Sequence, residues 1–208
     1  MSLQSASGVV LRRRIAGEGD LNLTLFLKGL GMAHVSAKGA AGGSVRFGGA
    51  TEPLVWGKFE LYRPRDEGGK LYLKSVDVAD DMLSLRNRPE ALFTAVRWFR
   101  LLTRRLMEGH ADDELLANLY WNMKLLCGGL PVEIVEWRFI WRWLKGWGLA
   151  PEISECAAGT FSELELLRFV CVAKSSELES FEPREALISK KHLFADASRR
   201  TETFLAET

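Results

Sequence analysis

Apolar and polar residues alternate along residues 8–39 in three short runs, which are separated by turns that contain glycine. In the second run the four leucines of residues 21–27 share one face, and in the third run Ala33, Val35 and Ala37 share one face. The first run ends in three successive arginines at residues 12–14. A period of two residues is typical of strands that are buried on one face, so we predict three half-buried antiparallel strands.

Two longer strands are expected after a glycine-rich loop at residues 39–50. Val55, Phe59 and Leu61 share one face of the fourth strand, and Leu71 and Leu73 share one face of the fifth. The turn between these strands is expected at residues 66–69. Five short strands within about 75 residues, without helical periodicity, indicate a small closed antiparallel barrel of the OB type over residues 1–79.

From residue 80 onward the apolar period changes to about 3.6 residues, which is typical of helices. One helix is expected to begin at Pro89 and another near Asp112. A third, at residues 131–147, is apolar on nearly every side, so we predict that it is the buried centre of a helical domain. The alternative is that its aromatic rings bind a cofactor, but no group of polar residues that could hold a cofactor accompanies them. We therefore expect an α+β protein of two domains, the barrel at residues 1–79 and an all-α domain at residues 80–208.

Basic and aromatic residues follow the outward positions of the predicted strands, and residues 1–80 hold eleven Lys and Arg against eight Asp and Glu. Single-stranded nucleic acid binds to such surfaces because bases stack on the rings while cations contact the phosphates. The alternative for the charged residues is an ordinary solvated face. The alternative for Trp56 and Tyr62 is packing against the helical domain. The predicted nucleic-acid-binding residues are Arg12, Arg13, Arg14, Lys28, Lys38, Arg46, Trp56, Lys58, Tyr62, Tyr72 and Lys74.

The order and spacing of several motifs resemble the start of RecO, a bacterial family that mediates DNA repair and recombination. These motifs are the turn at residues 17–20, the alternating leucines of residues 21–27, Lys38-Gly39, and Gly48-Gly49 followed by Pro53. The resemblance implies an OB domain followed by a helical domain. It also implies binding of single- and double-stranded DNA, annealing of complementary strands, and cooperation with RecR and the C-terminal tail of single-strand-binding protein in loading the recombinase RecA.

One departure from the family supports a second hypothesis, a scaffold that binds DNA weakly and acts mainly through protein contacts. RecO relatives commonly place several basic residues after the lysine-glycine of the third strand, whereas residues 40–43 here are alanine and glycine, which leaves only Arg46. A partner peptide that is acidic and apolar needs a groove with an apolar floor and a cationic rim. We predict that the rim is formed by Arg97, Arg100, Arg104 and Arg105, beside Trp98 and Leu101, although a solvated arginine face is the alternative.

Metal and catalytic motifs are not apparent in the sequence. Where RecO relatives often carry a zinc module, residues 150–165 retain Cys156 but have Gly159 at the next ligand position, so we expect no metal and no other cofactor. No nucleophile elbow, paired C-x-x-C or H-E-x-x-H motif occurs, and we expect a protein that is not an enzyme. An odd number of cysteines, three, without a short spacing between them, and the lack of an apolar run long enough to span a bilayer favour a cytoplasmic location.

Overall fold

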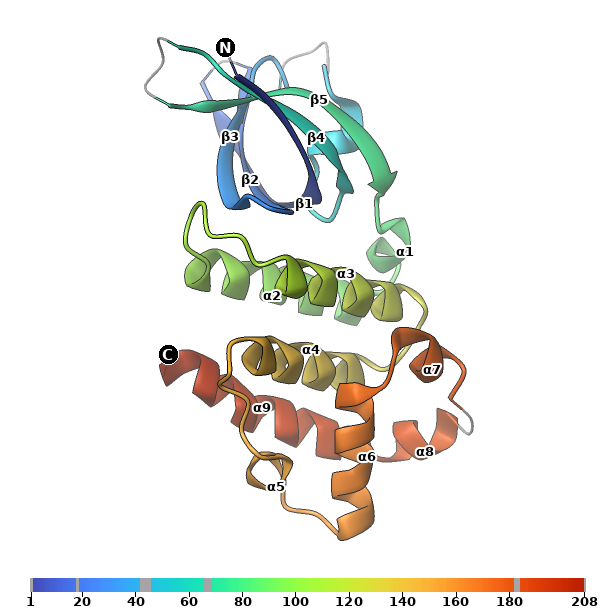
Figure 1. The fold of residues 1–208 in the computed structure, drawn as a ribbon. Helices are drawn as coiled ribbons and strands as arrows, with labels where there is room; N and C mark the ends of the chain where they lie inside the picture. Colours follow the sequence, from blue (N-terminus) through green and yellow to red (C-terminus); the bar gives the residue numbers. More distant parts are fainter. Residues whose placement is uncertain (1, 18, 42–45, 66–68, 182–183, 208) are drawn as a thin grey trace. The chain divides into compact units, whose positions relative to one another are not determined.

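The computed structural model describes residues 2–17, 19–41, 46–65, 69–181 and 184–207 (Figure 1). Contact density divides the chain into two compact units. The first comprises Met1–Leu83 and Ala95–Leu116, and the second comprises Ser84–Thr94 and Ala117–Thr208. The predicted division after residue 79 stays a prediction. Some residues of the sequence analysis lie outside the described residues. They are the expected turn residues Glu18 and Asp66–Gly68, and Gly42 and Gly43 in the segment where RecO relatives commonly have basic residues.

The first unit contains a closed five-stranded barrel, as predicted (Figure 1). Its strands are β1 (Ser2–Ala16), β2 (Asp20–Leu27), β3 (Gly31–Ala37), β4 (Trp56–Arg63) and β5 (Leu71–Asp80). They close in the order β1-β2-β3-β5-β4. The expectation of a purely antiparallel barrel was wrong, because β3 and β5 pair in parallel through Val35↔Leu71 and Ser36↔Tyr72. An odd number of strands cannot alternate in direction around a closed ring, so at least one neighbouring pair must be parallel.

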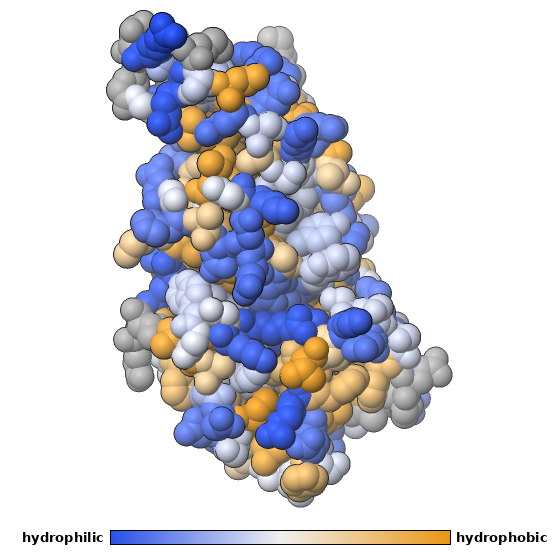
Figure 2. Space-filling view, in the orientation of Figure 1, coloured by the Kyte–Doolittle hydropathy of each residue, from blue (hydrophilic) through white to orange (hydrophobic). Residues whose placement is uncertain are grey.

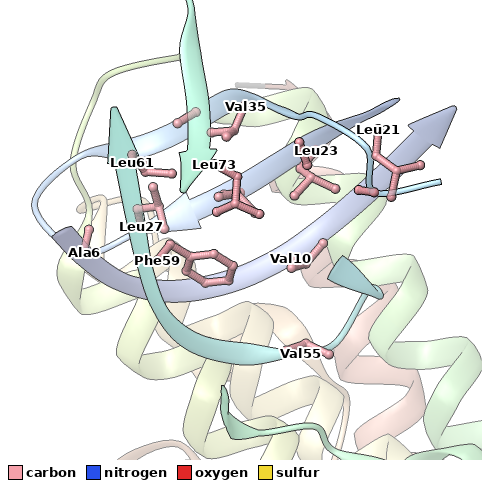
Figure 3. Packing of buried hydrophobic residues seen from close by; sticks show 14 residues of the cluster. Ala6, Val10, Leu21, Leu23, Leu27, Val35, Val55, Phe59, Leu61 and Leu73 are labelled. Atoms are coloured by element: carbon pink, nitrogen blue, oxygen red, sulfur yellow. The ribbon is translucent and has the colours of Figure 1, made fainter. Parts of the chain in front are cut away.

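The interior of the barrel is filled by residues from all five strands and the loops beside them (Figure 3). The predicted inward faces are confirmed, since every leucine at the alternating positions of β2 is at most 3% exposed. Burying a side chain of this size stabilises a fold by about 1.5–3 kcal/mol. The buried core consists of Ala6, Val10, Leu21, Leu23, Leu25, Leu27, Ala33, Val35, Ala37, Ala40, Val55, Phe59, Leu61 and Leu73.

Two short elements, η1 (Gly48–Thr51) and α1 (Leu83–Arg86), flank the last strands of the barrel. The helix α2 (Pro89–Arg105) begins at the proline that the sequence predicts, and its residues from Ala95 onward belong to the first unit. Backbone contact ties the segment after α2 to the barrel, because Gly109 N donates to the carbonyl of Met32 at 3.0 Å. The C-terminal half of α2 is thus part of the same compact unit as the barrel.

The second unit is built around α4 (Val132–Gly146), which packs against α9 (Lys191–Glu207) and α6 (Phe161–Val172). The predicted central helix is confirmed within this unit, because Trp137, Phe139 and Trp143 are at most 1% exposed. The remaining helices are α3 (Asp113–Cys127), α5 (Ile153–Cys156), α7 (Ser175–Glu179) and α8 (Arg184–Ser189). Hydrophobic patches lie among hydrophilic residues in the lower part of Figure 2, where Figure 1 places α5 and α6.

Two arginines of α4 bind the C-terminal end of α6. Arg142 donates to the carbonyls of Cys171 (2.6 Å), Val172 (3.1 Å) and Ala173 (2.9 Å), and Arg138 donates to the carbonyl of Ala173 at 2.8 Å. The last carbonyls of a helix lack intrahelical partners and carry partial negative charge, so a buried guanidinium is stabilised there without a carboxylate. Burial lowers the pKa of Arg138 to about 10, which leaves it charged at neutral pH.

Among the described residues, no helix is long and apolar enough to cross a membrane.

Candidate nucleic-acid interface

A β-bulge in β1 determines where its arginines point. The pairing with β2 shifts between Val10 and Arg12, so that Val10 pairs with Leu25 while Arg12 pairs with Thr24. Simple alternation from the buried Val10 would direct Arg12 and Arg14 into the core. The extra residue, Leu11, instead places both arginines on the outer face, and a bulge commonly re-aims side chains in this way.

Arg14 begins a row of five cross-strand neighbours on the outer face, which we call the polar row. Their pairing runs from Arg14 on β1 to Asn22 on β2, Ser36 on β3, Tyr72 on β5 and Tyr62 on β4. Neighbouring strands lie about 4.8 Å apart, so four steps give the row a path of about 19 Å around the curved surface of the barrel. Cationic, hydrogen-bonding and aromatic side chains thus follow one another across the whole barrel.

A hollow of about 350 Å³, the barrel hollow, lies along the first half of the polar row. Three basic residues, Arg12, Arg14 and Lys70, are among the residues that line it. Between them, the Oγ1 of Thr24 lies 3.4 Å from Nδ1 of His34. Cationic and hydrogen-bonding side chains of this kind are the ones that contact phosphate oxygens in complexes with nucleic acids. The lining residues are Arg12, Arg14, Asn22, Leu23, Thr24, His34, Val35, Ser36 and Lys70.

Two tyrosines occupy the other half of the polar row. The ring of Tyr72 is buried, at 5% exposure, beneath the ammonium groups of Lys38 (5.9 Å from the ring centroid) and Lys70 (5.6 Å). Tyr62 stacks on Tyr72 with 5.4 Å between the centroids and is half-buried. Burial rules out Tyr72 as a ring on which a base stacks, so the sequence expectation for Tyr72 was wrong. Tyr62 remains the ring of the pair that a base can reach.

Lys38 is fixed at the edge of this tyrosine pair by Asp20. Its Nζ lies 2.9 Å from Oδ2 of Asp20, and the backbone N–H of Gly39 donates to Oδ1 of the same carboxylate at 2.9 Å. The Gly39 N–H and the Lys38 ammonium lower the pKa of Asp20. Lys38 therefore contributes less free positive charge than Arg12 or Arg14, which form no ion pair with any described residue.

Other predicted residues lie outside the polar row. Lys58 is the cross-strand neighbour of Asp77, and Lys74 forms an ion pair of 3.2 Å with Glu60. Lys28 follows the opposite end of β2, about 20 Å from Asn22 for six residues of extended strand. The guanidinium of Arg46 lies over the ring of Phe47, 5.0 Å from its centroid. The eleven predicted residues are thus not brought together as one site.

Trp56 is also misplaced for base stacking, and the sequence expectation for it was wrong. It is 7% exposed, and it begins a cross-strand row that continues through Val9, Phe26 and Met32. All four face outward from the barrel, yet each is at most 7% exposed. Trp56 thus belongs to a buried apolar row on the outside of the barrel.

A second hollow, of about 580 Å³, lies between the barrel and α2 within the first unit, and we call it the arginine groove. Its lining combines apolar residues with four arginines, Arg100 and Arg104 of α2 and Arg12 and Arg13 of β1. Arg13 is held by Glu52, with 2.7 Å between Nη1 and Oε1. The lining residues are Leu11, Arg12, Arg13, Thr24, Met32, His34, Pro53, Val96, Phe99, Arg100, Thr103 and Arg104.

The predicted rim on α2 is therefore only half present in this groove. Arg97 and Arg105 do not line it, and neither do Trp98 and Leu101. Trp98 is fully buried because it lies on the inward stripe of α2 with Ala95 and Leu102. The expectation that Trp98 borders a peptide was wrong, and the half-buried Val96 is the α2 residue with an accessible apolar side chain in the groove.

Sequence reasoning missed five residues of the barrel hollow: Asn22, Thr24, His34, Ser36 and Lys70. The first four occupy the outward positions of two adjacent strands, and that alternation was visible in the sequence. Their meeting with Arg12 and Arg14 depended on the register that the bulge sets.

Elsewhere, Cys156 is fully buried and donates from Sγ to the carbonyl of Glu152 at 3.4 Å. The described residues include no cluster of three or more His, Cys, Asp or Glu that could hold a metal.

Comparison with known proteins agrees with the motifs of the barrel. Residues 1–81 match the family described as "Recombination protein O N terminal". The chain is similar to proteins named "DNA repair protein RecO" from Exiguobacterium sp. (28% identity over 154 residues, 74% of this chain and 61% of that protein) and from Gloeobacter violaceus (29% over 160 residues, 73% and 58%). A third, from Anaeromyxobacter dehalogenans, is 32% identical over 158 residues, 76% of this chain and 61% of that protein.

The chain spans about three fifths of the length of the curated relatives that it matches. The family match covers the whole barrel, and the similarity to the relatives extends into the helices that follow it. The predicted resemblance is confirmed: residues 1–81 match the N-terminal domain of the RecO family, and the chain is similar to proteins named "DNA repair protein RecO".

Proposed function

We propose that this protein acts in DNA repair and recombination by binding DNA on the outer face of its barrel. Relatives named as DNA repair proteins support the repair role. The observation that carries the proposal is the polar row together with the barrel hollow, where Arg12, Arg14 and Lys70 meet without a carboxylate among the lining residues. Such a surface neutralises phosphates, while Tyr62 at the other end offers a ring to a base.

The proposed interface is suited to binding single strands without regard to sequence, and not to recognising particular bases. OB folds bind single strands over about 4–16 nucleotides, with bases stacked on rings and a basic groove along the backbone. A row about 19 Å long contacts a short part of such a strand. Phosphate contacts carry no sequence information, so we expect binding that tolerates most sequences and extends to double-stranded DNA with lower affinity.

Annealing of complementary strands is the activity that this surface supports. Two strands repel each other through their phosphates, and a cationic surface lowers that repulsion while they pair. No bond is made or broken in this process, so the proposed role is that of a mediator rather than an enzyme. By the family resemblance, we propose that RecR and single-strand-binding protein cooperate with it in loading the recombinase.

Matched triple variants test the DNA-binding proposal. Arg12, Arg14 and Lys70 are replaced by alanine in one variant, and Lys28, Lys58 and Lys74 in the other, so that both lose three positive charges. Binding of a fluorescent single strand is measured over a series of salt concentrations. The slope of log affinity against log salt falls by about 0.7 for each lost phosphate contact, so the first variant should lose about 2 and the second far less.

An equal fall in slope for both variants would show that only net charge matters, and would overturn the proposed interface. Thermal unfolding of each variant shows whether it is folded. The two variants share the same change in formal charge, so long-range attraction of DNA is equal in both. The difference between their slopes therefore measures local contact with phosphates.

The arginine groove favours a second candidate function, the binding of an acidic and apolar peptide. Arg100 and Arg104 form no ion pair with any described residue, and they line the groove together with the half-buried Val96. This chemistry fits the C-terminal tail of single-strand-binding protein that the RecO resemblance implies. Under the scaffold hypothesis, this contact rather than DNA would be the main activity.

A further inference from the structure

We infer that the arginine groove and the barrel hollow cannot be occupied at the same time, so that an acidic peptide and a DNA strand exclude each other. This inference rests on the proposed function, because it assumes that each hollow has its proposed ligand. Its basis is that the two hollows share Arg12, Thr24 and His34 as lining residues. Both hollows lie in the first unit, so the sharing does not depend on the second.

The shared residues form a cross-strand row of their own. Arg12 pairs with Thr24, and Thr24 pairs with His34, two positions along the strands from the polar row. Residues two apart on a strand are about 7 Å from each other, so this row separates the two hollows by the width of one side chain. Arg12 is its only arginine or lysine.

The charges around this row make simultaneous binding of the two ligands unfavourable. No Asp or Glu is among the residues that line either hollow, and among their arginines and lysines only Arg13 forms an ion pair with a described residue, Glu52. A phosphate and a peptide carboxylate on the two sides of Arg12 would compete for one guanidinium. They would also lie within the screening length of about 8 Å at physiological salt, and would repel each other.

Exclusion would give the protein an ordered exchange of ligands. While an acidic tail occupies the arginine groove, Arg12 is engaged by the tail, and the strand is kept out of the barrel hollow. When DNA engages Arg12, the peptide loses one of its cations and is weakened by the same factor, since the coupling between two ligands is reciprocal. A partner that brings its tail to the groove would thus be released as the strand is taken up.

A crossed set of variants tests this arrangement. Arg14 and Lys70 line only the barrel hollow, Arg100 and Arg104 line only the arginine groove, and Arg12 lines both. The binding of a fluorescent single strand and of a fluorescent acidic peptide with an apolar end is measured separately for each variant at constant ionic strength. We expect Arg14→Ala with Lys70→Ala to weaken only DNA, Arg100→Ala with Arg104→Ala to weaken only the peptide, and Arg12→Ala to weaken both.

Competition is then measured by adding unlabelled peptide to the bound strand. The apparent Kd for DNA should rise in proportion to peptide concentration, and tenfold when peptide is at about nine times its own Kd, as simple exclusion requires. The Arg100→Ala, Arg104→Ala variant should bind DNA as the parent does and should resist the same peptide. A peptide with glutamine and asparagine in place of its acids serves as the control.

The outcomes separate this inference from the proposed function. If saturating peptide leaves the Kd for DNA unchanged and a ternary complex forms, exclusion is overturned while DNA binding stands. If the peptide does not bind, or its binding is indifferent to Arg100 and Arg104, the arginine groove is not its site and exclusion is overturned as well. If the parent shows no salt-dependent DNA binding before peptide is added, the proposed function itself is overturned.

Discussion

The ring of Tyr62 stacks on the ring of Tyr72, with their centroids 5.4 Å apart and their planes inclined by 24°. The two residues are direct cross-strand neighbours on β4 and β5. Tyr72 is buried under Lys38 and Lys70, so it holds Tyr62 in place rather than contacting a ligand itself. A ring whose position is already fixed loses little conformational freedom when a base stacks on it.

We therefore predict that Tyr62→Ala weakens single-strand binding. Stacking of a base on an aromatic side chain contributes about 1–3 kcal/mol, which corresponds to a loss of about 5-fold to 150-fold in affinity. The salt dependence should stay as in the parent, because no phosphate contact is removed. Tyr62→Phe keeps the ring and serves as the control. Equal affinities for the alanine variant and the parent, measured by fluorescence anisotropy at one salt concentration, would exclude Tyr62 from the interface.

Periodicity predicted the buried parts of this protein well. The inward leucines of β2, the inward faces of β4 and β5, and the buried helix α4 are all as expected, because burial alternates with the period of the element. The parallel pairing of β3 and β5 followed from ring closure with five strands, and an expectation built on local patterns overlooked it.

The candidate site was predicted less well, because it depends on register. Lys58 and Lys74 look available in sequence, but the facing carboxylates of Asp77 and Glu60 come from neighbouring strands. Trp56 looks exposed by alternation, yet its cross-strand row is buried. The bulge at Leu11 decides that Arg12 and Arg14 face outward, and one extra residue leaves no clear mark in the hydrophobic pattern.

A pair of glycines offers a test of how tightly the barrel is joined to the segment after α2. Gly29 and Gly31 both have φ of +71°, which costs an alanine about 1–2 kcal/mol at either position. A Cβ at Gly29 would meet nothing within 4 Å, whereas a Cβ at Gly31 would lie 2.0 Å from the carbonyl oxygen of His110. Backbone would have to move to relieve the second contact.

We predict that Gly29→Ala lowers the free energy of unfolding by about 1–2 kcal/mol and that Gly31→Ala lowers it by clearly more. Denaturant unfolding of both variants measures the difference. Since φ is the same at the two positions, the excess at Gly31 reports the packing of β3 against residues 107–111. Equal losses in the free energy of unfolding would mean that residues 107–111 move aside for the added methyl group without destabilising the protein.

Zinc content tests the interpretation of residues 150–165. Burial raises the pKa of Cys156, and it raises the pKa of Cys171 well above its usual range. Zinc binds thiolates, so two buried thiols are poor ligands. We predict that the purified protein contains no stoichiometric zinc and that EDTA leaves its Tm unchanged. Elemental analysis that finds one zinc for each chain would contradict this interpretation.

The last prediction concerns acid stability and the start of α6. The carboxylate of Glu163 lies 2.6 Å from Nζ of Lys190, and it accepts hydrogen bonds from the backbone N–H and hydroxyl of Thr160 at 2.9 and 3.1 Å. The Lys190 ammonium, followed by the Thr160 groups, lowers the pKa of Glu163 to about 2 from an ordinary value of 4.5. A carboxyl whose pKa is lowered on folding stabilises the protein at high pH and stops doing so as pH falls.

The contribution of Glu163 should therefore be complete above about pH 4.5 and should disappear as the pH falls to about 2. We predict that Glu163→Gln lowers the Tm at pH 7 and that the gap between variant and parent closes as the pH falls through this range. Glu165→Gln is the matched control, because Glu165 lies on the same helix in an exposed pair with Arg168, and such pairs contribute little. A gap that stays constant from pH 7 to pH 2 would show that Glu163 acts through its shape at the helix start and not through its charge.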